Sequence, residues 1–216
     1  MFRAVLVITC AGALAACAPH RSADSADIAK VLDVKASFGP QFHVTSVAPT
    51  GIDPTLFAAQ KLPPGMKFEP AACTKFALGQ SMPPGLRGNM AAVSAEGQGN
   101  RFITIAVQTS QPVPVTPPGP DCQKVGFAGG QLRGVIEVVA APQIADAQTL
   151  GVHRVVQTVL DGKPSVGELY DYSARFGSYQ VIVTANPLVA PDKPVAPVDT
   201  QRARDLLVAA VTAIRG

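Results

Sequence analysis

The sequence of 216 residues contains no tryptophan, and charged residues make up only 15% of it. So low a charge content excludes a charge-driven disordered chain and a coiled coil. The formal net charge is only +3 and no segment concentrates lysine and arginine, so we expect no nucleic-acid partner. Glycine and proline are plentiful instead, with 19 and 20 residues, and they follow no collagen-like period. The length fits a single domain that can bury a core of its own.

The first residues of the chain are typical of a bacterial export signal. One positive charge in Met1–Arg3 precedes an uncharged apolar run over 4–13, and Leu14-Ala15-Ala16-Cys17 follows. The run is too short for a transmembrane helix and fits the apolar part of a signal peptide. Leu-Ala-Ala-Cys looks like the lipobox of bacterial lipoproteins, in which the cysteine receives a diacylglyceryl group and becomes the new N-terminus.

This pattern predicts a signal peptide over 1–16, a lipidated tether over 17–26 and one extracytoplasmic domain over 27–216. Cys17 would carry the lipid and anchor the protein at the outer face of the cell membrane. The alternative is an ordinary signal peptide with a cysteine at its cleavage site by coincidence. Cys10 matches a lipobox less well, because Val-Ile-Thr precedes it.

Cys73 and Cys122 are the cysteines that remain for the expected mature domain. Disulfides persist in extracytoplasmic compartments, and one pair allows one connectivity. The bridge would close a loop of about 50 residues and stabilise the fold by roughly 4 kcal/mol in the chain-entropy model. Two buried free thiols and a metal site are the alternatives, although no Cys-x-x-Cys motif and no closely spaced histidine accompany the pair.

Hydrophobic periodicity predicts more strand than helix. The first elements are a short helix over 27–38 with Asp27 as N-cap, a strand over 41–47 and a short helix over 70–78 that holds Cys73. Further strands are expected over 90–96, 101–108, 131–139, 150–160, 167–175 and 179–185. Glycine-containing turns join the first two of these strands, and also the last two, as hairpins. Proline-rich segments between the elements are expected to be exposed loops.

The burial pattern completes the expected layout. In the strand over 101–108, the face with Ile103, Ile105 and Val107 is expected to be buried. The C-terminal helix over 199–215, with Asp199 or Thr200 as N-cap, has an apolar stripe: Ala203, Leu207, Ala210, Val211 and Ile214. The predicted class is therefore α+β, an antiparallel sheet of about six to seven hairpin-linked strands with N-terminal and C-terminal helices packed on it.

This layout resembles a known group of proteins. A lipobox leads to a short polar tether, Pro70-Ala71-Ala72-Cys73 and Pro120-Asp121-Cys122 each hold one cysteine, and a helix with Asp205–Val211 closes the chain. Over residues 27–215 it is similar to small actinobacterial, especially mycobacterial, lipoproteins of a family with no assigned function. More loosely, it resembles the extracellular sensor domain of mycobacterial PknH-type receptor serine/threonine kinases. The resemblance implies a cleft for an unidentified ligand and no catalytic residues. Those sensor domains have two disulfides, where this chain can form one.

Motifs of common enzymes are missing from the sequence. There is no Gly-x-Ser-x-Gly, no His-Glu-x-x-His, no P-loop and no penicillin-binding motif set. His43 and His153 lie on expected strands and would need a serine and a carboxylate beside them to act in a hydrolase. Glu168 and Asp171 have opposite parity on one strand, so a paired-carboxylate site is not expected. We expect no catalytic residue, no metal and no cofactor.

Candidate ligand-binding residues gather on the later strands. Tyr170 and Tyr172 share one strand face and Phe176 borders the next turn, so the three rings form either an aromatic wall of a ligand cleft or a packed sheet face. Three strands carry one arginine each, which either converge on an anionic group or are solvated separately: Arg133, Arg154 and Arg175.

The sequence therefore indicates a membrane-anchored, non-catalytic module that binds a small-molecule, lipid or other envelope-derived ligand. One alternative is an envelope protein that docks a protein partner through a sheet edge or proline-rich loops, and another is a hydrolase of unfamiliar type. A binding module predicts a concave pocket lined by Val, Ile, Leu and aromatic residues. A docking protein predicts an exposed apolar patch instead.

Overall fold

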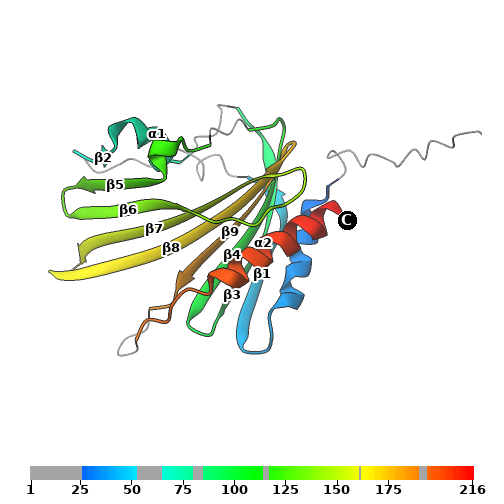
Figure 1. Ribbon diagram of the computed structural model, residues 1–216. Helices are drawn as coiled ribbons and strands as arrows, with labels where there is room; N and C mark the ends of the chain where they lie inside the picture. Colours follow the sequence, from blue (N-terminus) through cyan, green and yellow to red (C-terminus); the bar gives the residue numbers. More distant parts are fainter. Residues whose placement is uncertain (1–25, 53–64, 80–84, 114–116, 161, 190–193) are drawn as a thin grey trace, which may run out of the picture.

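The computed structural model describes residues 26–52, 65–79, 85–113, 117–160, 162–189 and 194–216. The strands of these residues form one antiparallel sheet in the order β1-β3-β4-β9-β8-β7-β6-β5-β2 (Figure 1). They are β1 (Phe42–Gly51), β2 (Lys67–Glu69), β3 (Gly88–Gly97), β4 (Asn100–Thr109), β5 (Lys124–Gly129), β6 (Leu132–Val139), β7 (Gln148–Leu160), β8 (Lys163–Phe176) and β9 (Tyr179–Pro187). The helical segments are η2 (Ile28–Ser37), η4 (Ala71–Cys73), α1 (Thr74–Ala77), η5 (Pro120–Cys122) and α2 (Thr200–Arg215).

The α+β class is confirmed, but the sheet is larger than the sequence predicted. The described residues contain nine strands where six to seven were expected, and the two missed strands, β2 and β5, lie together at one edge. β2 has only three residues, and β5 has glycine at Gly126 and Gly129, so neither shows the β-branched run that predicts a strand. The two expected hairpins are present as β3–β4 and β8–β9.

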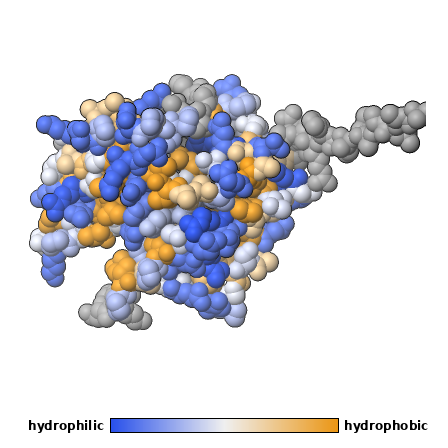
Figure 2. Space-filling model, in the orientation of Figure 1, coloured by the Kyte–Doolittle hydropathy of each residue, from blue (hydrophilic) through white to orange (hydrophobic). Residues whose placement is uncertain are grey.

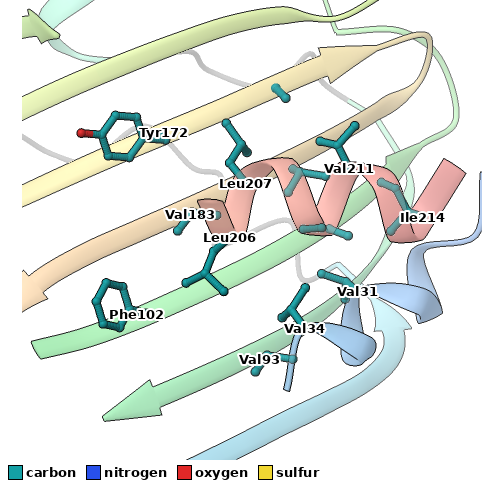
Figure 3. Close-up of a cluster of buried hydrophobic side chains, with 14 of the residues drawn as sticks. Val31, Val34, Val93, Phe102, Tyr172, Val183, Leu206, Leu207, Val211 and Ile214 are labelled. Carbon is teal, nitrogen blue, oxygen red and sulfur yellow. The ribbon is translucent and has the colours of Figure 1, made fainter. Parts of the chain in front are cut away.

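The main hydrophobic core lies between the sheet and two helices on one face, which we call the helix-side face (Figure 3). α2 buries the stripe that its sequence predicted, together with Leu206, against strand residues that include Phe102 and Val183. η2 lies beside α2 and buries Val31 and Val34 in the same core. It begins as expected at Asp27, whose side chain caps it, but it is a 3-10 helix.

β4 turns the opposite face to the core from the one expected. The buried residues on its helix-side face are Phe102, Thr104 and Ala106. On the other face, Ile103 and Ile105 are only half-buried, and Val107 is buried but lies outside the main core. The prediction that the Ile103, Ile105 and Val107 face packs into the main core is therefore wrong. Phe102 supplies the bulk on the helix-side face of β4, and small residues elsewhere on that face let the helices approach closely. Five such residues are fully buried there: Ala91, Ala95, Ala106, Ala174 and Ala185.

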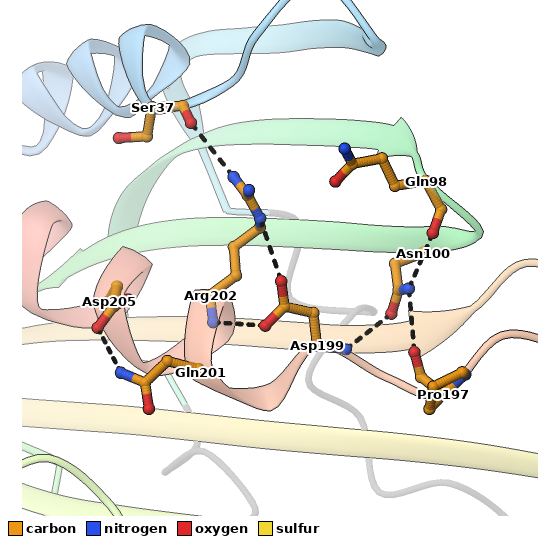
Figure 4. A network of polar contacts seen from close by, with 8 residues as sticks. All are labelled: Ser37, Gln98, Asn100, Pro197, Asp199, Gln201, Arg202 and Asp205. Atoms are coloured by element: carbon orange, nitrogen blue, oxygen red, sulfur yellow. Dashed lines mark hydrogen bonds and ion pairs between the residues drawn. The ribbon is translucent and has the colours of Figure 1, made fainter.

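A buried asparagine holds the start of α2 beside the β3–β4 turn (Figure 4). The amide nitrogen of Asn100 donates to the carbonyls of Gln98 at 3.3 Å and Pro197 at 3.2 Å. Its amide oxygen accepts from the backbone N–H of Asp199 at 3.1 Å. Asp199 then caps α2, because its carboxylate accepts from the backbone N–H of Arg202 at 2.9 Å. These bonds fix where α2 begins over the sheet.

The opposite face of the sheet carries a second, smaller core at the β5 edge. Cys73 and Cys122 form the expected disulfide and join η4 to η5. Beneath it Val125 of β5 and Ile136 of β6 are buried together with Ala77 of α1. Closing the loop between the two cysteines stabilises this edge by about 4 kcal/mol in the chain-entropy model. The short helical segments η4, α1 and η5 thus pack on the face that η2 and α2 do not cover.

The described fold begins at the C-terminal end of α2. The backbone N–H of Asp27 donates to the carbonyl of Ile214 at 2.8 Å. Arg215 donates to the carbonyl of Ala145 at 2.7 Å, and its guanidinium lies 4.1 Å from the ring centre of Phe176. In the described part of the chain, no helix combines the length and the apolar character that crossing a bilayer requires.

Alanine substitutions on β4 test which face carries the core. We expect Phe102→Ala to lower the free energy of unfolding by about 3–5 kcal/mol, because it leaves a cavity under the helices. Ile103→Ala, on the other face and half-exposed, should cost only about 1–2 kcal/mol. Urea denaturation followed by circular dichroism measures both values. An equal or larger loss for Ile103→Ala would contradict the assignment of the faces.

Candidate functional site

The two long helices cover only part of the helix-side face, and the remainder forms a groove. α2 packs on β4, β9 and β8, whereas β7, β6, β5 and β2 extend the sheet beyond it (Figure 1). Over these four strands lies an open groove of about 450 Å³. That volume is within the range of small-molecule binding sites. Figure 2 shows hydrophobic surface among hydrophilic side chains on this side of α2.

Strand pairing arranges the helix-side residues of the groove in rows that cross the strands. One row is apolar in its middle, where Gly126 pairs with Val135 and Val135 with Val155. A carboxylate stands at each end of this row, with Glu69 next to Gly126 on β2 and Glu168 next to Val155 on β8. The floor of the groove is therefore apolar and its two ends are acidic.

The neighbouring row carries positive charge. Lys67 of β2 pairs with Ala128 of β5, and Ala128 pairs with Arg133 of β6. Nε of Arg133 donates to Oε1 of Gln157 at 2.9 Å, which orients the guanidinium across β6 and β7. None of the ion pairs between described residues involves Lys67 or Arg133. Two cationic side chains thus flank one small residue beside the apolar floor.

A stacked histidine and tyrosine separate the groove from the main core. His153 and Tyr170 pair across β7 and β8, with ring centres 4.1 Å apart and planes tilted by only 9°. Nε2 of His153 lies 2.9 Å from Oε1 of Glu168. Tyr170 also packs against the main core, and the next helix-side residue of β8, Tyr172, is buried with the guanidinium of Arg204 over its ring. The stacked pair therefore forms the boundary between the covered and uncovered sheet.

The electrostatics of this boundary keep the tyrosine neutral. Burial and the nearby carboxylate of Glu168 raise the pKa of Tyr170 above its ordinary value, and Glu137 adds a smaller contribution. Both effects disfavour the phenolate, so Tyr170 keeps its hydroxyl proton to a higher pH than an ordinary tyrosine does. Glu137 pairs with His153 on the other side and forms an ion pair with Lys124 at 3.9 Å.

The three aromatic residues proposed from the sequence as a cleft wall lie in different environments. Tyr170 borders the groove, whereas Tyr172 and Phe176 are buried in the main core, at 1% and 6% exposure. Phe176 stacks on Tyr179 with ring centres 5.7 Å apart. None of the three rings lines the groove, and Tyr170 is the one that lies outside the fully buried core.

The three candidate arginines do not come together. Arg133 faces the groove, whereas Arg154 and Arg175 lie on the opposite face of the sheet, as the register of β6, β7 and β8 requires. On that face the hydroxyl of Thr184 donates to Oδ1 of Asp171 at 2.7 Å. Burial raises the pKa of Asp171, against the opposing effects of Thr184 and Arg154. Arg133 is thus the only one of the three beside the groove.

The two histidines lie on opposite faces and far apart in the sheet. His43 is exposed on the edge strand β1, and β3, β4, β9 and β8 lie between it and His153 on β7. Glu168 and Asp171 also face opposite sides, as their parity predicted. The described residues contain no group of three or more His, Cys, Asp or Glu side chains that could hold a metal ion.

The sequence predicted a concave pocket but not its position. Much of its lining comes from β2 and β5, the two strands that the sequence did not reveal. Alternation of Val125 and Phe127 was the available signal for β5, but the glycines beside them obscured it. The proposed lipidation site, Cys17, lies outside the described residues, so its modification stays a prediction.

The fold and the groove define a class of protein: an α+β domain whose large antiparallel sheet is half covered by two helices. The model of a domain family of unknown function, DUF5642, matches residues 27–215, and the chain belongs to this family. The chain is also similar to an uncharacterized protein from Mycobacterium smegmatis, an Rv0999 ortholog, whose X-ray structure is known. The two share 62% sequence identity over 89% of this chain and 98% of that one, with a TM-score of 0.82. None of the curated proteins compared with the chain matches it. The expected similarity to mycobacterial proteins of unknown function is thus confirmed.

Removal of one carboxylate tests the electrostatics of the boundary. We expect Glu168→Gln to lower the pKa of Tyr170 towards its ordinary value, because a neutral amide no longer opposes phenolate formation. Glu137→Gln is the matched control and should lower the pKa less. The phenolate absorbance of the three tyrosines, with Tyr170→Phe to assign the signal, measures the change. An unchanged titration in Glu168→Gln would refute this account.

Proposed function

We propose that the protein is a lipid-anchored, extracytoplasmic binding module whose ligand occupies the groove over β2, β5, β6 and β7. The observation that carries the proposal is the groove of about 450 Å³, whose apolar floor lies beyond the two helices that cover the rest of this face. Apolar surface in water costs about 25 cal/mol per Å² relative to burial. A ligand that covers Val135 and Val155 would recover part of that free energy.

The construction of the groove supports binding without a large rearrangement. Its floor residues lie on hydrogen-bonded strands, and the Cys73–Cys122 disulfide braces β5 and β6 from the opposite face. Polar side chains at its margins are already held by partners, as in the Arg133–Gln157 and His153–Glu168 pairs. Preorganised side chains lose little conformational entropy when a ligand arrives. The module is therefore non-catalytic and sensor-like in this proposal, as the resemblance to kinase sensor domains also suggests.

The anchor rests on the Leu-Ala-Ala-Cys sequence that ends at Cys17. We expect Cys17→Ala, expressed in full length in an actinobacterial host, to lose the diacylglyceryl group and to keep residues 1–16, because Cys17 is both the lipid site and the new N-terminus. Cys10→Ala is the control and should leave the protein in the membrane fraction. Fractionation with mass measurement of the N-terminal peptide follows both variants. An unmodified N-terminal peptide in the wild-type protein, or a lipid-modified one in Cys17→Ala, would exclude this anchor.

Native mass spectrometry of residues 27–216 tests the binding function. We expect an additional mass on the domain purified from an actinobacterial host, and its loss after solvent extraction. Val155→Trp should reduce the occupied fraction roughly tenfold, because the indole fills the groove floor. Val47→Trp makes the same change at an exposed site on β1 and should retain the ligand.

An unmodified mass for the wild-type domain would argue against the binding function. A bound mass that persists in Val155→Trp would place the ligand elsewhere on the molecule.

A protein-docking function is the second candidate. Val159 and Val166, at 41% and 60% exposure, lie at the tip of the β7–β8 hairpin on the helix-side face. Exposed apolar residues next to one another are a feature of protein interfaces. The same spectra separate the two functions by the size of the additional mass. A docked protein partner adds the mass of a polypeptide, whereas a ligand in the groove adds that of a small molecule.

A further inference from the structure

We infer that the groove takes an anionic amphiphile, a molecule with one negatively charged head group and an acyl or alkyl chain. This inference rests on the proposed binding function and adds the chemical class of the ligand. It follows from the order of charged and apolar residues across β2, β5, β6 and β7.

The head group would lie between Lys67 and Arg133. These residues are two strands apart with Ala128 between them, which separates their backbones by about 10 Å. Both side chains are long and exposed, so their charged ends can converge above the single methyl group of Ala128. The bond from Arg133 to Gln157 uses Nε and leaves the terminal nitrogens of the guanidinium for a phosphate or carboxylate.

The chain would lie on the apolar row next to these cations. Gly126, Val135 and Val155 form a continuous floor across three strands, and the half-buried valines offer apolar contact without large side chains that would block it. Glycine at position 126 adds no side chain, so the floor is lowest beside β2. A chain of this kind gains about 0.8 kcal/mol for each methylene that it buries.

The carboxylates at the ends of the floor determine the orientation of such a ligand. Glu69 and Glu168 flank the apolar row and repel a negative head group placed on it. The adjacent row offers Lys67 and Arg133, which have no ion-pair partner among the described residues. Charge therefore selects both the sign of the head group and the row on which it lies.

Isothermal titration calorimetry with three probes tests this class on residues 27–216, the segment that contains every described strand and helix. The probes are decyl phosphate, decyl maltoside and inorganic phosphate, with both amphiphiles kept below their micelle concentrations. We expect decyl phosphate to bind roughly tenfold tighter than decyl maltoside, because only the phosphate can form two partly exposed ion pairs, with Lys67 and Arg133. Inorganic phosphate alone should show no binding, and added salt should reduce the preference for decyl phosphate.

Variants separate the head-group site from the floor. The double variant Lys67→Ala, Arg133→Ala should lose the tenfold preference and bind both amphiphiles equally. Lys35→Ala, Arg87→Ala removes the same charge from exposed sites elsewhere and should keep the preference. Val155→Trp should weaken both amphiphiles, because the floor is shared.

Equal binding of the two amphiphiles by the wild-type domain would overturn the anionic class and leave the binding function standing. Binding of inorganic phosphate as tight as that of decyl phosphate would also overturn it, in favour of a simple anion site. If no amphiphile binds while the native spectrum shows a bound mass, the ligand class is wrong and the proposed function survives. If the spectrum shows no bound mass either, both fail.

Discussion

The close packing of two helices against one face of the sheet is the constraint from which the rest of the molecule follows. α2 and η2 pack on β1, β3, β4, β9 and β8 through a core that combines five fully buried alanines of the sheet with large side chains such as Phe102 and Tyr172. Asn100 fixes the start of α2 beside the β3–β4 turn, so the helix cannot slide further along the sheet. Two helices of this length cover little more than half of nine strands, and the uncovered strands form the groove.

The long β7–β8 hairpin connects the two halves of the sheet. At one end its residues belong to the main core, and at the other they line the groove or reach solvent. His153 and Tyr170 stack where the environment changes from buried to exposed, and Glu168 is held at the same place. Strands β5 and β6 are supported from behind by the disulfide and by Val125 and Ile136. This support holds the groove strands in place although none of the described helices covers them on the groove side.

Much of this architecture was readable from the sequence, and the exceptions have physical causes. The helix stripe of α2, the cap at Asp199, two hairpins and the Cys73–Cys122 pair were all predicted, because each depends on local pattern or on the pairing of few cysteines. The buried face of β4 was not predicted, since apolarity along the strand favoured its isoleucines, whereas the helices pack on the face with Phe102, Thr104 and Ala106. The position of the groove was missed because contacts between distant strands create it, and β2 and β5 have weak local signals.

The bond between Asp27 and the carbonyl of Ile214 has a consequence for how an anchored molecule would face its surroundings. It holds the first described residues at the end of α2 that lies over Phe176, where β7 begins at Gln148. Val155 is seven residues further along β7, so the groove lies about 23 Å from that end. In the proposed anchored molecule, the tether would therefore join the domain at a point away from the groove.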